Sequence, residues 1–307
     1  MKFIVHNNVL AFALVLICNK LCISSAFVAK QHSERTINTR LNSNSNGESD
    51  FSTPDMGDVG FVLLAGGTGS RMKAGMPKQY LPLRGVPVLH HSLDLFLEKL
   101  VDHCKSNNKG TSSPPENVVL VMDPLYQPEY QSIVDRYPGR LEFANPGVER
   151  QGSVENGLNK LVEMSKGKCQ FVAIHDSARP LVTIEEICNV VVDAKEHGAA
   201  VLGVPCKATI KESEDGSFVA RTIPRSKLWE VHTPQVIKIE TLLKGFKKVA
   251  AENLEVTDDV SVVEALGEPV KLTRGEYTNL KITTPEDMDV AEAILEDRKS
   301  KPVNMLA

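Results

Sequence analysis

The sequence predicts an α/β fold, a three-layer sandwich in which a mostly parallel sheet lies between two layers of helices. From Val59 onward, short runs rich in Val, Leu and Ile alternate with longer amphipathic stretches. The runs are almost continuously apolar, as expected for parallel strands that are buried on both faces. Regular alternation of such strands with helices is typical of the three-layer sandwich.

The predicted strands are apolar runs of similar length. They are Gly60–Ala65, Asn117–Met122, Gln170–Ile174 and Ala199–Val204. The predicted helices between them are Pro87–Cys104, Gln151–Met164 and Thr183–His197. The last of these ends in His-Gly, a cationic end followed by a C-cap glycine. The segment 284–287, Thr-Pro-Glu-Asp, opens a final helix with a Thr N-cap, Pro at the first helical position and an acidic residue at the third.

One region interrupts this alternation. Ala208–Glu212 and Phe218–Ile223 flank the turn-like sequence Ser213–Ser217, which together predict a β-hairpin. We expect a protruding β-arm near residues 206–232 that packs on a second copy of the chain. The Ser-, Asn- and Pro-rich stretch Lys105–Pro115 predicts a loop.

The first 50 residues are predicted to be a targeting segment and not part of the fold. Residues 1–26 combine Lys2, an apolar run of about ten residues and a small-residue exit, which is typical of a signal peptide and too short to span a bilayer. Residues 27–50 are rich in Ser, Thr and Asn and resemble a transit peptide. With Phe27 at the junction, the whole is similar to the bipartite presequence of algae with complex plastids. This similarity implies a plastid location, with plain secretion as the alternative.

Composition limits the class of protein. The chain has 35 Lys and Arg against 39 Asp and Glu, a net charge of −4, which argues against a nucleic-acid partner. The first 50 residues carry five of the bases and three of the acids, so residues 51–307 carry −6. Their length suits one α/β domain with an arm, without a membrane span in the mature form. Six cysteines are too few for a disulfide scaffold.

A glycine-rich turn carries the strongest chemical signal. The sequence Leu63–Met72, LLAGGTGSRM, follows the first strand and is itself followed by Pro-Lys-Gln-Tyr at 77–80. The free backbone amides of such a turn can bind phosphate. A Rossmann G-x-G-x-x-G pattern would need Gly at Met72, and a Walker A loop would need Gly at Arg71, so both patterns fail. Arg71 and Lys78 are close enough in sequence to meet around one polyphosphate and to stabilise a departing pyrophosphate.

Several separate motifs occur in an order that resembles one family. They are Ala65–Arg71, Pro77–Gln79, Glu149–Val154, His175–Pro180, Thr233–Gln235, Thr257–Asp259 and Asn279–Thr283. Together they are similar to the 2-C-methyl-D-erythritol 4-phosphate cytidylyltransferases, in particular the plastid type, over about residues 59–295. This resemblance implies a Rossmann-like nucleotidyltransferase sheet and a homodimer formed through the arm. It also implies transfer of a cytidylyl group from CTP to 2-C-methyl-D-erythritol 4-phosphate, with Mg²⁺, in isoprenoid precursor synthesis.

The resemblance also implies the roles of individual residues. Arg71 and Lys78 would stabilise the transition state, and Arg225 and Lys281 would position the attacking phosphate. The residues expected at the nucleotide are Ala65, Gly66, Gly67, Arg150, Ser153 and Asp176, and Asp176 would also lie near Mg²⁺. Those expected at the polyol phosphate are Arg179, Thr209, Thr233 and Thr257, with Thr209 and Arg225 reaching a neighbouring subunit's substrate.

The residues themselves leave alternatives open for some of these roles. Asp176 follows a predicted strand, where open α/β sheets bind ligands, but it could equally cap a helix or loop. Arg150 and Arg179 could each be structural ion-pair partners. His175 is expected to be a buried, hydrogen-bonded histidine and not a base, because a phosphate nucleophile needs no deprotonation. Val148 and Thr278 depart from the acidic residues frequent at these positions in bacterial members, so neither is included in the site.

Three other functions remain to be weighed against this one. The first is a cytidylyltransferase for ribitol 5-phosphate, which shares the glycine turn. The second is a hexose-phosphate nucleotidyltransferase, although such chains usually carry a further domain. The third is a non-catalytic nucleotide-binding protein, which retention of both Arg71 and Lys78 disfavours. Release of pyrophosphate with each candidate polyol phosphate would separate them.

Overall fold

The computed structural model describes residues 53–67, 72, 75–106 and 112–300. Every one of these lies in the unit that comprises residues Phe51–Ala307. The predicted signal peptide, transit segment and Arg71 lie outside the described residues.

A seven-stranded sheet with the order β11-β7-β10-β6-β1-β4-β5 forms the centre of this unit. Its strands are β1 (Val59–Leu64), β4 (Val118–Val121), β5 (Leu141–Ala144), β6 (Phe171–Asp176), β7 (Ala199–Pro205), β10 (Trp229–Lys238) and β11 (Lys271–Arg274). Only β10 runs antiparallel to its neighbours, β6 and β7, among the described strand pairs of this sheet. The predicted mostly parallel sheet is therefore confirmed.

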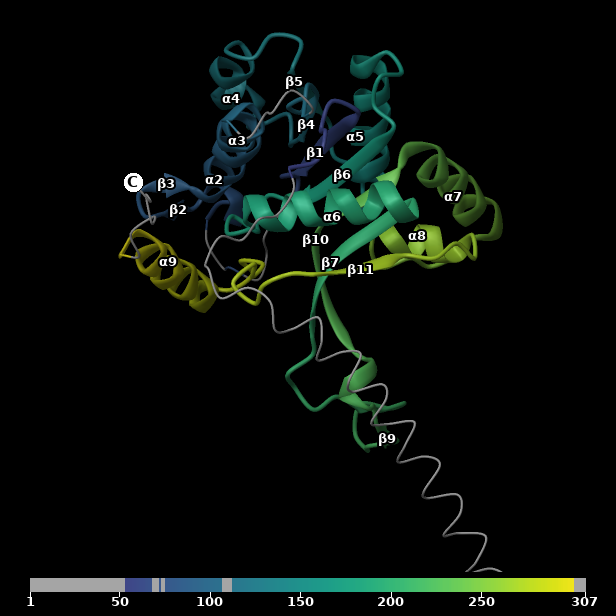
Figure 1. Ribbon diagram of the computed structural model, residues 1–307. Coiled ribbons are helices and arrows are strands. Elements are labelled where there is room, and N and C mark those ends of the chain that lie inside the picture. Colours follow the sequence, from purple (N-terminus) through teal and green to yellow (C-terminus); the bar gives the residue numbers. More distant parts are fainter. Residues whose placement is uncertain (1–52, 68–71, 73–74, 107–111, 301–307) are drawn as a thin grey trace, which may run out of the picture. The chain divides into compact units, whose positions relative to one another are not determined.

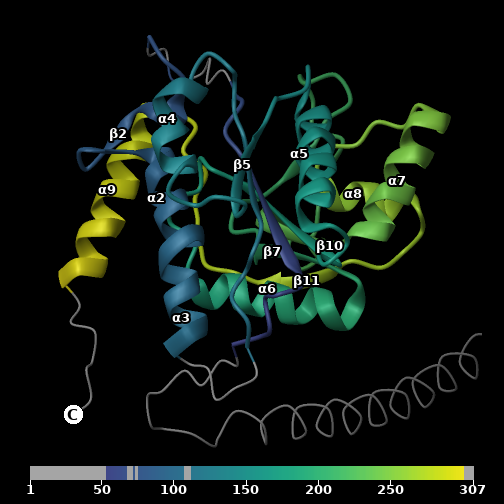
Figure 2. The same cartoon turned by 90° about the horizontal axis from the view of Figure 1, so that it is seen from above.

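Alternating residues of the central strands enter two separate cores. On β1, Phe61 and Leu63 belong to one core and Val62 to the other, because successive side chains of a strand point to opposite faces. Helices α2 (Val88–Asp94), α3 (Leu100–Ser106), α4 (Gln127–Val134) and α6 (Ile184–His197) contribute to the first core, and α5 (Arg150–Ser165), α7 (Ile239–Glu252) and α8 (Asp259–Ala265) to the second. Figures 1 and 2 show these two helical layers on opposite sides of the sheet, which is the expected three-layer sandwich.

The end of α6 has the expected C-cap glycine, and both α6 and α9 (Pro285–Ser300) begin with hydrogen bonds between side chains and backbone N–H groups. Thr183 and Glu186 form a capping box at the start of α6, and Gly198 ends this helix with φ +88°. At the start of α9, the Asp287 carboxylate accepts hydrogen bonds from the backbone N–H of Thr283 and Thr284, at 2.7 and 2.8 Å. The predicted helix Pro87–Cys104 is helical from Val88 to Ser106, with a π-helical turn at Leu95–Lys99 between α2 and α3.

The predicted arm leaves the sheet between β7 and β10. Its hairpin strands are short, β8 (Lys211–Glu212) and β9 (Arg221–Thr222), and they pair antiparallel. Residues 229–231, at the end of the expected arm, pair with β7 in the main sheet. Figure 1 shows the arm projecting from the carboxyl end of β7, away from the helical layers.

A second small hairpin, β2 (Pro82–Leu83) and β3 (Val86–Pro87), follows the Pro-Lys-Gln-Tyr sequence and packs against α9. Sequence analysis did not identify this hairpin, nor β5, β10, β11, α4, α7 and α8. None of the described helices is long and apolar enough to cross a membrane.

Candidate active site

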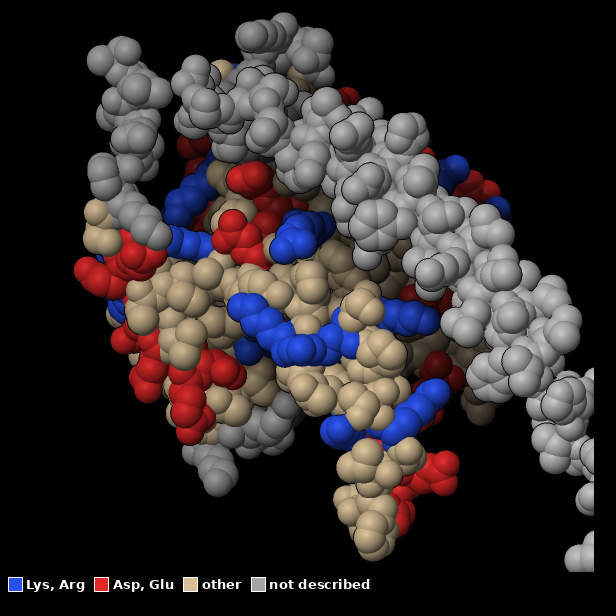
Figure 3. Space-filling view, turned by 60° about the horizontal axis from the view of Figure 1, so that its bottom comes forward, with Lys and Arg blue, Asp and Glu red and all other residues tan. Residues whose placement is uncertain are grey.

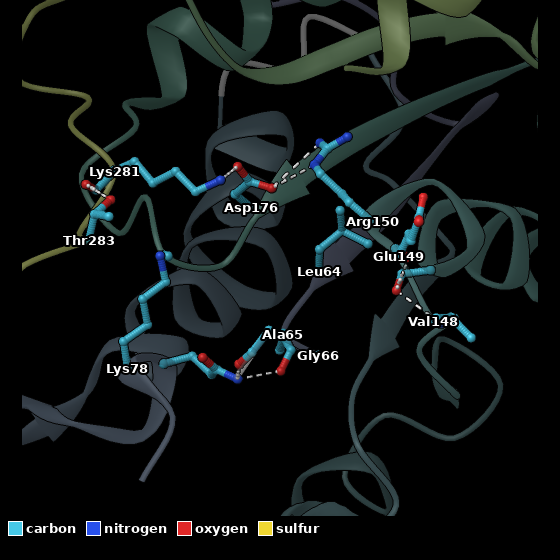
Figure 4. Close-up of a pocket in the computed structure, with 15 residues that line it drawn as sticks. Leu64, Ala65, Gly66, Lys78, Val148, Glu149, Arg150, Asp176, Lys281 and Thr283 are labelled. Carbon is cyan, nitrogen blue, oxygen red and sulfur yellow. Dashed lines mark hydrogen bonds and ion pairs between the residues drawn. The ribbon is translucent and has the colours of Figure 1, made fainter. Parts of the chain in front are cut away.

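A pocket of about 410 Å³ opens at the carboxyl edge of the sheet, where β1 and β6 end (Figure 4). Open α/β sheets bind ligands at this edge. The lining comes from the turn after β1, the loop before α5, the end of β6 and the segment that precedes α9. The residues that line it are Leu64, Ala65, Gly66, Gly67, Lys78, Gln79, Gly147, Val148, Glu149, Arg150, Ser153, Asp176, Ala178, Lys281 and Thr283.

Glycines allow two loops to approach each other at this pocket. A Cβ atom on Gly66 would lie 2.6 Å from Pro146 Cβ, and one on Gly147 would lie 2.5 Å from the Gly152 carbonyl carbon, both shorter than real contacts. At Gly67, by contrast, a Cβ would meet nothing within 4 Å. Packing among the described residues therefore requires glycine at Gly66 and Gly147, whereas Gly67 leaves its backbone open to the pocket.

Gln79 holds the turn after β1 in shape. This buried side chain donates from Nε2 to the carbonyl oxygens of Ala65 at 2.6 Å and Gly67 at 2.9 Å. The neighbouring Lys78 extends into the pocket, and its Nζ donates to the Ile282 carbonyl at 2.7 Å. One short 3₁₀ turn, Lys78–Tyr80, thus supports the glycine backbone and supplies a cation beside it.

Asp176 is the acidic centre of the pocket. Lys281 Nζ donates to its Oδ2 at 2.7 Å, and Arg150 Nε lies 3.5 Å from its Oδ1 (Figure 4). Burial alone would raise the pKa of this carboxyl, but the cations of Arg150 and Lys281 outweigh it and hold the pKa well below its usual range. Asp176 is therefore a carboxylate at neutral pH.

Arg150 makes its shortest contacts with a second carboxylate, behind the pocket. Its Nη1 and Nη2 donate to the two carboxylate oxygens of Asp259 at 2.7 and 2.8 Å, a bidentate ion pair. Burial, together with the nearby Asp176 charge, raises the pKa of Asp259 in spite of this pairing. One guanidinium thus lies between two carboxylates and faces the pocket with a third of its side chain exposed.

His175 and Thr233 fix the end of β6 from behind. The Thr233 hydroxyl accepts a hydrogen bond from the Asp176 backbone N–H at 3.1 Å and also contacts His175 Nδ1 at 3.1 Å. Burial lowers the pKa of His175 to about 4, so the imidazole is neutral at physiological pH. The expectation of a buried, hydrogen-bonded histidine is supported by these contacts.

The structure brings together eight of the residues predicted for the site. These are Ala65, Gly66, Gly67, Lys78, Arg150, Ser153, Asp176 and Lys281. Thr233 is buried and supports Asp176 without lining the pocket. Arg179 is also buried, where its Nη1 donates to the Asn279 carbonyl at 2.7 Å.

Three further predicted residues are exposed and also lie outside this pocket. Thr257 is exposed before α8, where its backbone N–H donates to the Ser261 hydroxyl. Thr209 and Arg225 are exposed on the arm, and Arg225 Nη1 donates to the Lys207 carbonyl at 2.9 Å. Their predicted contacts with a neighbouring subunit concern an assembly of two chains, so these roles stay predictions.

Sequence analysis missed two residues that organise the pocket, Gln79 in its lining and Asp259 behind it. Both belong to motifs that it quoted, Pro77–Gln79 and Thr257–Asp259, but it chose Lys78 and Thr257 from them. The neighbouring positions within those motifs were the available signal.

The fit of a divalent cation depends on Asp176. No group of three or more His, Cys, Asp or Glu side chains suited to a metal ion occurs among the described residues. Mg²⁺ commonly binds through one or two carboxylates together with substrate phosphates, and a single ionised Asp176 at the pocket fits that mode.

The family model for 2-C-methyl-D-erythritol 4-phosphate cytidylyltransferase matches residues 59–297. A curated relative from Oryza sativa subsp. japonica, 2-C-methyl-D-erythritol 4-phosphate cytidylyltransferase, chloroplastic, is 46% identical over 78% of this chain and 75% of its own length. The enzyme of that name from Desulforamulus reducens is 40% identical over 79% of this chain and 98% of its own.

Solved structures agree with these matches. The 2-C-methyl-D-erythritol 4-phosphate cytidylyltransferase of Thermus thermophilus has a TM-score of 0.60 and 28% identity, covering 78% of this chain and 99% of that one. One conclusion follows from the family-model match over most of the chain, the two relatives and the shared fold. The chain belongs to the 2-C-methyl-D-erythritol 4-phosphate cytidylyltransferase family.

Proposed function

We propose that the pocket transfers a cytidylyl group from CTP to 2-C-methyl-D-erythritol 4-phosphate, giving 4-diphosphocytidyl-2-C-methyl-D-erythritol and pyrophosphate. The observation that carries the proposal is the convergence of an open glycine backbone at Gly67 with Lys78, Arg150, Lys281 and an ionised Asp176 in one pocket. Membership of the family supports the choice of substrates.

The reaction is a direct displacement. An oxygen of the polyol phosphate attacks the α-phosphorus of CTP, and the bond from that phosphorus to the bridging oxygen of the β-phosphate breaks, which releases pyrophosphate. The attacking monoester is already an anion at neutral pH, so no residue has to remove a proton from it. Catalysis then rests on alignment of the two phosphates and on stabilisation of the charge that moves to the leaving group.

We assign the nucleotide to the side of the pocket formed by the turn after β1 and the start of α5. The backbone of Ala65–Gly67 would contact the nucleoside, beside Arg150 and Ser153. Lys78 would stabilise the leaving pyrophosphate together with Arg71, which lies outside the described residues. Ser153 supports its loop directly, because its hydroxyl accepts from the Gly147 N–H at 3.0 Å and donates to the Glu149 carbonyl at 3.1 Å.

We assign the polyol phosphate to the side of Lys281 and Arg179, with Thr233 and Thr257 contributing. Arg179 Nε has no hydrogen-bond partner among the described residues although it is buried, and such an atom is suited to a substrate group. Thr209 and Arg225 would reach this side from the arm of a second copy, in a homodimer. Mg²⁺, held by Asp176 and the CTP phosphates, would neutralise phosphate charge when bound.

The presequence would deliver this enzyme to a plastid. The chloroplastic relative from rice supports a plastid location. The signal-like segment before the transit-like one favours a complex plastid, and plain secretion is the alternative. Imaging of residues 1–50 fused to a fluorescent protein, in an alga with a complex plastid, would separate the two.

Pyrophosphate release tests the proposal. The purified chain lacking residues 1–50 is incubated with CTP, Mg²⁺ and either 2-C-methyl-D-erythritol 4-phosphate or ribitol 5-phosphate. We expect release with the first polyol phosphate and much slower release with the second. Preference for ribitol 5-phosphate would replace the substrate, and no release with either would support a non-catalytic nucleotide-binding protein.

A further inference from the structure

We propose that Asp259 is a positioning residue for the reaction, which acts by holding the Arg150 guanidinium in place at the nucleotide. The inference rests on the proposed function of the pocket. Thr257–Asp259 contains two adjacent acids with different surroundings. Asp258 caps α8 by accepting from the Ser261 N–H at 3.0 Å, whereas Asp259 is 3% exposed and binds Arg150.

The position of Asp259 is fixed by the central sheet. The side-chain oxygen of Gln235, on β10, accepts hydrogen bonds from the backbone N–H of Asp259 at 2.9 Å and of Val260 at 3.0 Å. The Gln235 Nε2 donates to Asp258 Oδ2 at 3.2 Å. A buried strand residue therefore anchors the first turn of α8, and this anchor determines where the Asp259 carboxylate lies.

Arg150 is shared unequally between the two carboxylates at the pocket. Its contacts with Asp259 are 2.7 and 2.8 Å, whereas its nearest atoms are 3.5 Å from Asp176. Bidentate pairing restrains the plane of the guanidinium as well as its position. Asp259 thus keeps Arg150 at the pocket wall and keeps it from closing onto Asp176.

Because Arg150 is also close to Asp176, this restraint affects how the pocket binds the nucleotide. Arg150 lies between two carboxylates, Asp176 and Asp259, whereas Lys281 pairs with Asp176. Without the charge of Asp259, Arg150 would turn to Asp176, the one carboxylate of the pair that lines the pocket. Asp176 would then be less available to the ribose and to Mg²⁺, and Arg150 would be withdrawn from the nucleotide.

The test uses Asp259→Asn, which keeps the shape of the side chain and removes its charge. We expect the affinity for CTP with Mg²⁺, measured by calorimetry, and kcat/KM for CTP to fall about tenfold, the lower end of the effects seen when a supporting partner of a functional side chain is lost. The KM for the polyol phosphate should stay within about twofold of wild type, since its site lies on the other side of Asp176. Glu264→Gln, an exposed acid on the same helix, is the matched control and should leave both values unchanged.

A double-mutant cycle with Arg150→Met separates positioning from a structural role. If Asp259 acts through Arg150, Asp259→Asn should add less than about twofold in the Arg150→Met background. Equal losses in both backgrounds, or unchanged CTP affinity in Asp259→Asn, would overturn the inference. Asp259→Glu, which keeps the buried charge but shifts the carboxylate by one methylene, replaces Asp259→Asn in the same cycle if the Asn variant does not fold. Wild-type turnover, measured first, tests the proposed function separately.

Discussion

The pocket at the sheet edge and the arm are organised in opposite ways. Contacts with segments distant in sequence fix the pocket residues, because Lys78, Arg150, Asp176 and Lys281 each have such a hydrogen bond. Thr209 and Arg225 are exposed on a hairpin of two-residue strands. Figure 3 shows lysine and arginine side chains in a band across the face from which the arm projects. We therefore expect one chain to suffice for the nucleotide, whereas the proposed polyol phosphate site would also take an arm from a second copy.

Lys78→Ala should have the largest effect, because the sheet side of the site depends on a cation fixed beside the glycine turn. We expect kcat to fall by about 10²–10³-fold, the range seen when one preorganised group that stabilises the transition state is removed. The melting temperature should change little, since Lys78 is half-buried at the pocket. Pyrophosphate release and a thermal melt measure the two quantities, and wild-type turnover in this variant would contradict the assigned role.

Arg225→Ala tests whether the arm acts on another chain. The variant should lose at least about tenfold in kcat/KM for the polyol phosphate, because a positioning cation is removed from the attacking group. When the Arg225→Ala and Lys78→Ala proteins are mixed and allowed to exchange subunits, half of the sites in each mixed dimer carry both wild-type residues. Activity should then recover to about a quarter of wild type. A mixture no more active than its components would show that Arg225 serves its own chain.

A smaller effect is expected on the free energy of unfolding when the pH falls, and it arises from buried histidines of the sheet. Burial lowers the pKa of His175 to about 4, and burial together with Arg179 lowers that of His232 to about 4, from an unfolded value of 6.5. The unfolded chain therefore takes up protons below pH 6.5 that the folded chain takes up only near pH 4. The free energy of unfolding should fall by about 2 kcal/mol per histidine from pH 7 to pH 5.

Urea titrations at both pH values measure this slope. His175→Gln should flatten it whatever its effect on stability at pH 7, and an unchanged slope would contradict the prediction. The lowered pKa of Asp176 acts below pH 3.8 and does not overlap this window. Residues 206–228 of the arm contain no histidine, so the arm should contribute nothing to the slope.

Sequence analysis predicted the centre of the fold because the central strands are buried on both faces. Val118–Val121 and Phe171–Ile174 are continuous apolar runs, the pattern expected of strands buried on both faces. The edge strands β5 (Leu-Glu-Phe-Ala) and β11 (Lys-Leu-Thr-Arg) were missed because each is short and exposes part of its length. β10 was missed because polar residues, His232, Thr233 and Gln235, interrupt its buried half.

Sequence analysis identified those site residues whose position at the end of a strand or the start of a helix determines where they lie in the fold. Asp176 ends a strand and Arg150 begins a helix beside it, so both reach the carboxyl edge of the sheet. The partnership of Arg150 with Asp259 joins residues 109 positions apart and depends on how α8 packs. No local pattern reports such a contact, and Thr257 was taken from that motif because the family resemblance implied it.

Phe218→Ala, on the arm, should have the smallest effect on the free energy of unfolding. Phe61→Ala, in the sheet, is the variant with which it is compared. Phe61 is fully buried on β1, and its truncation should lower the free energy of unfolding by about 3–5 kcal/mol. Phe218 is 80% exposed on the arm, so its truncation should change that free energy by less than about 0.5 kcal/mol at protein concentrations where the chain is monomeric. Sedimentation at higher concentration should show weaker self-association, because Phe218, Val219 and Ile210 expose apolar surface that a second copy would cover. Self-association equal to wild type would mean that the arm does not make the interface.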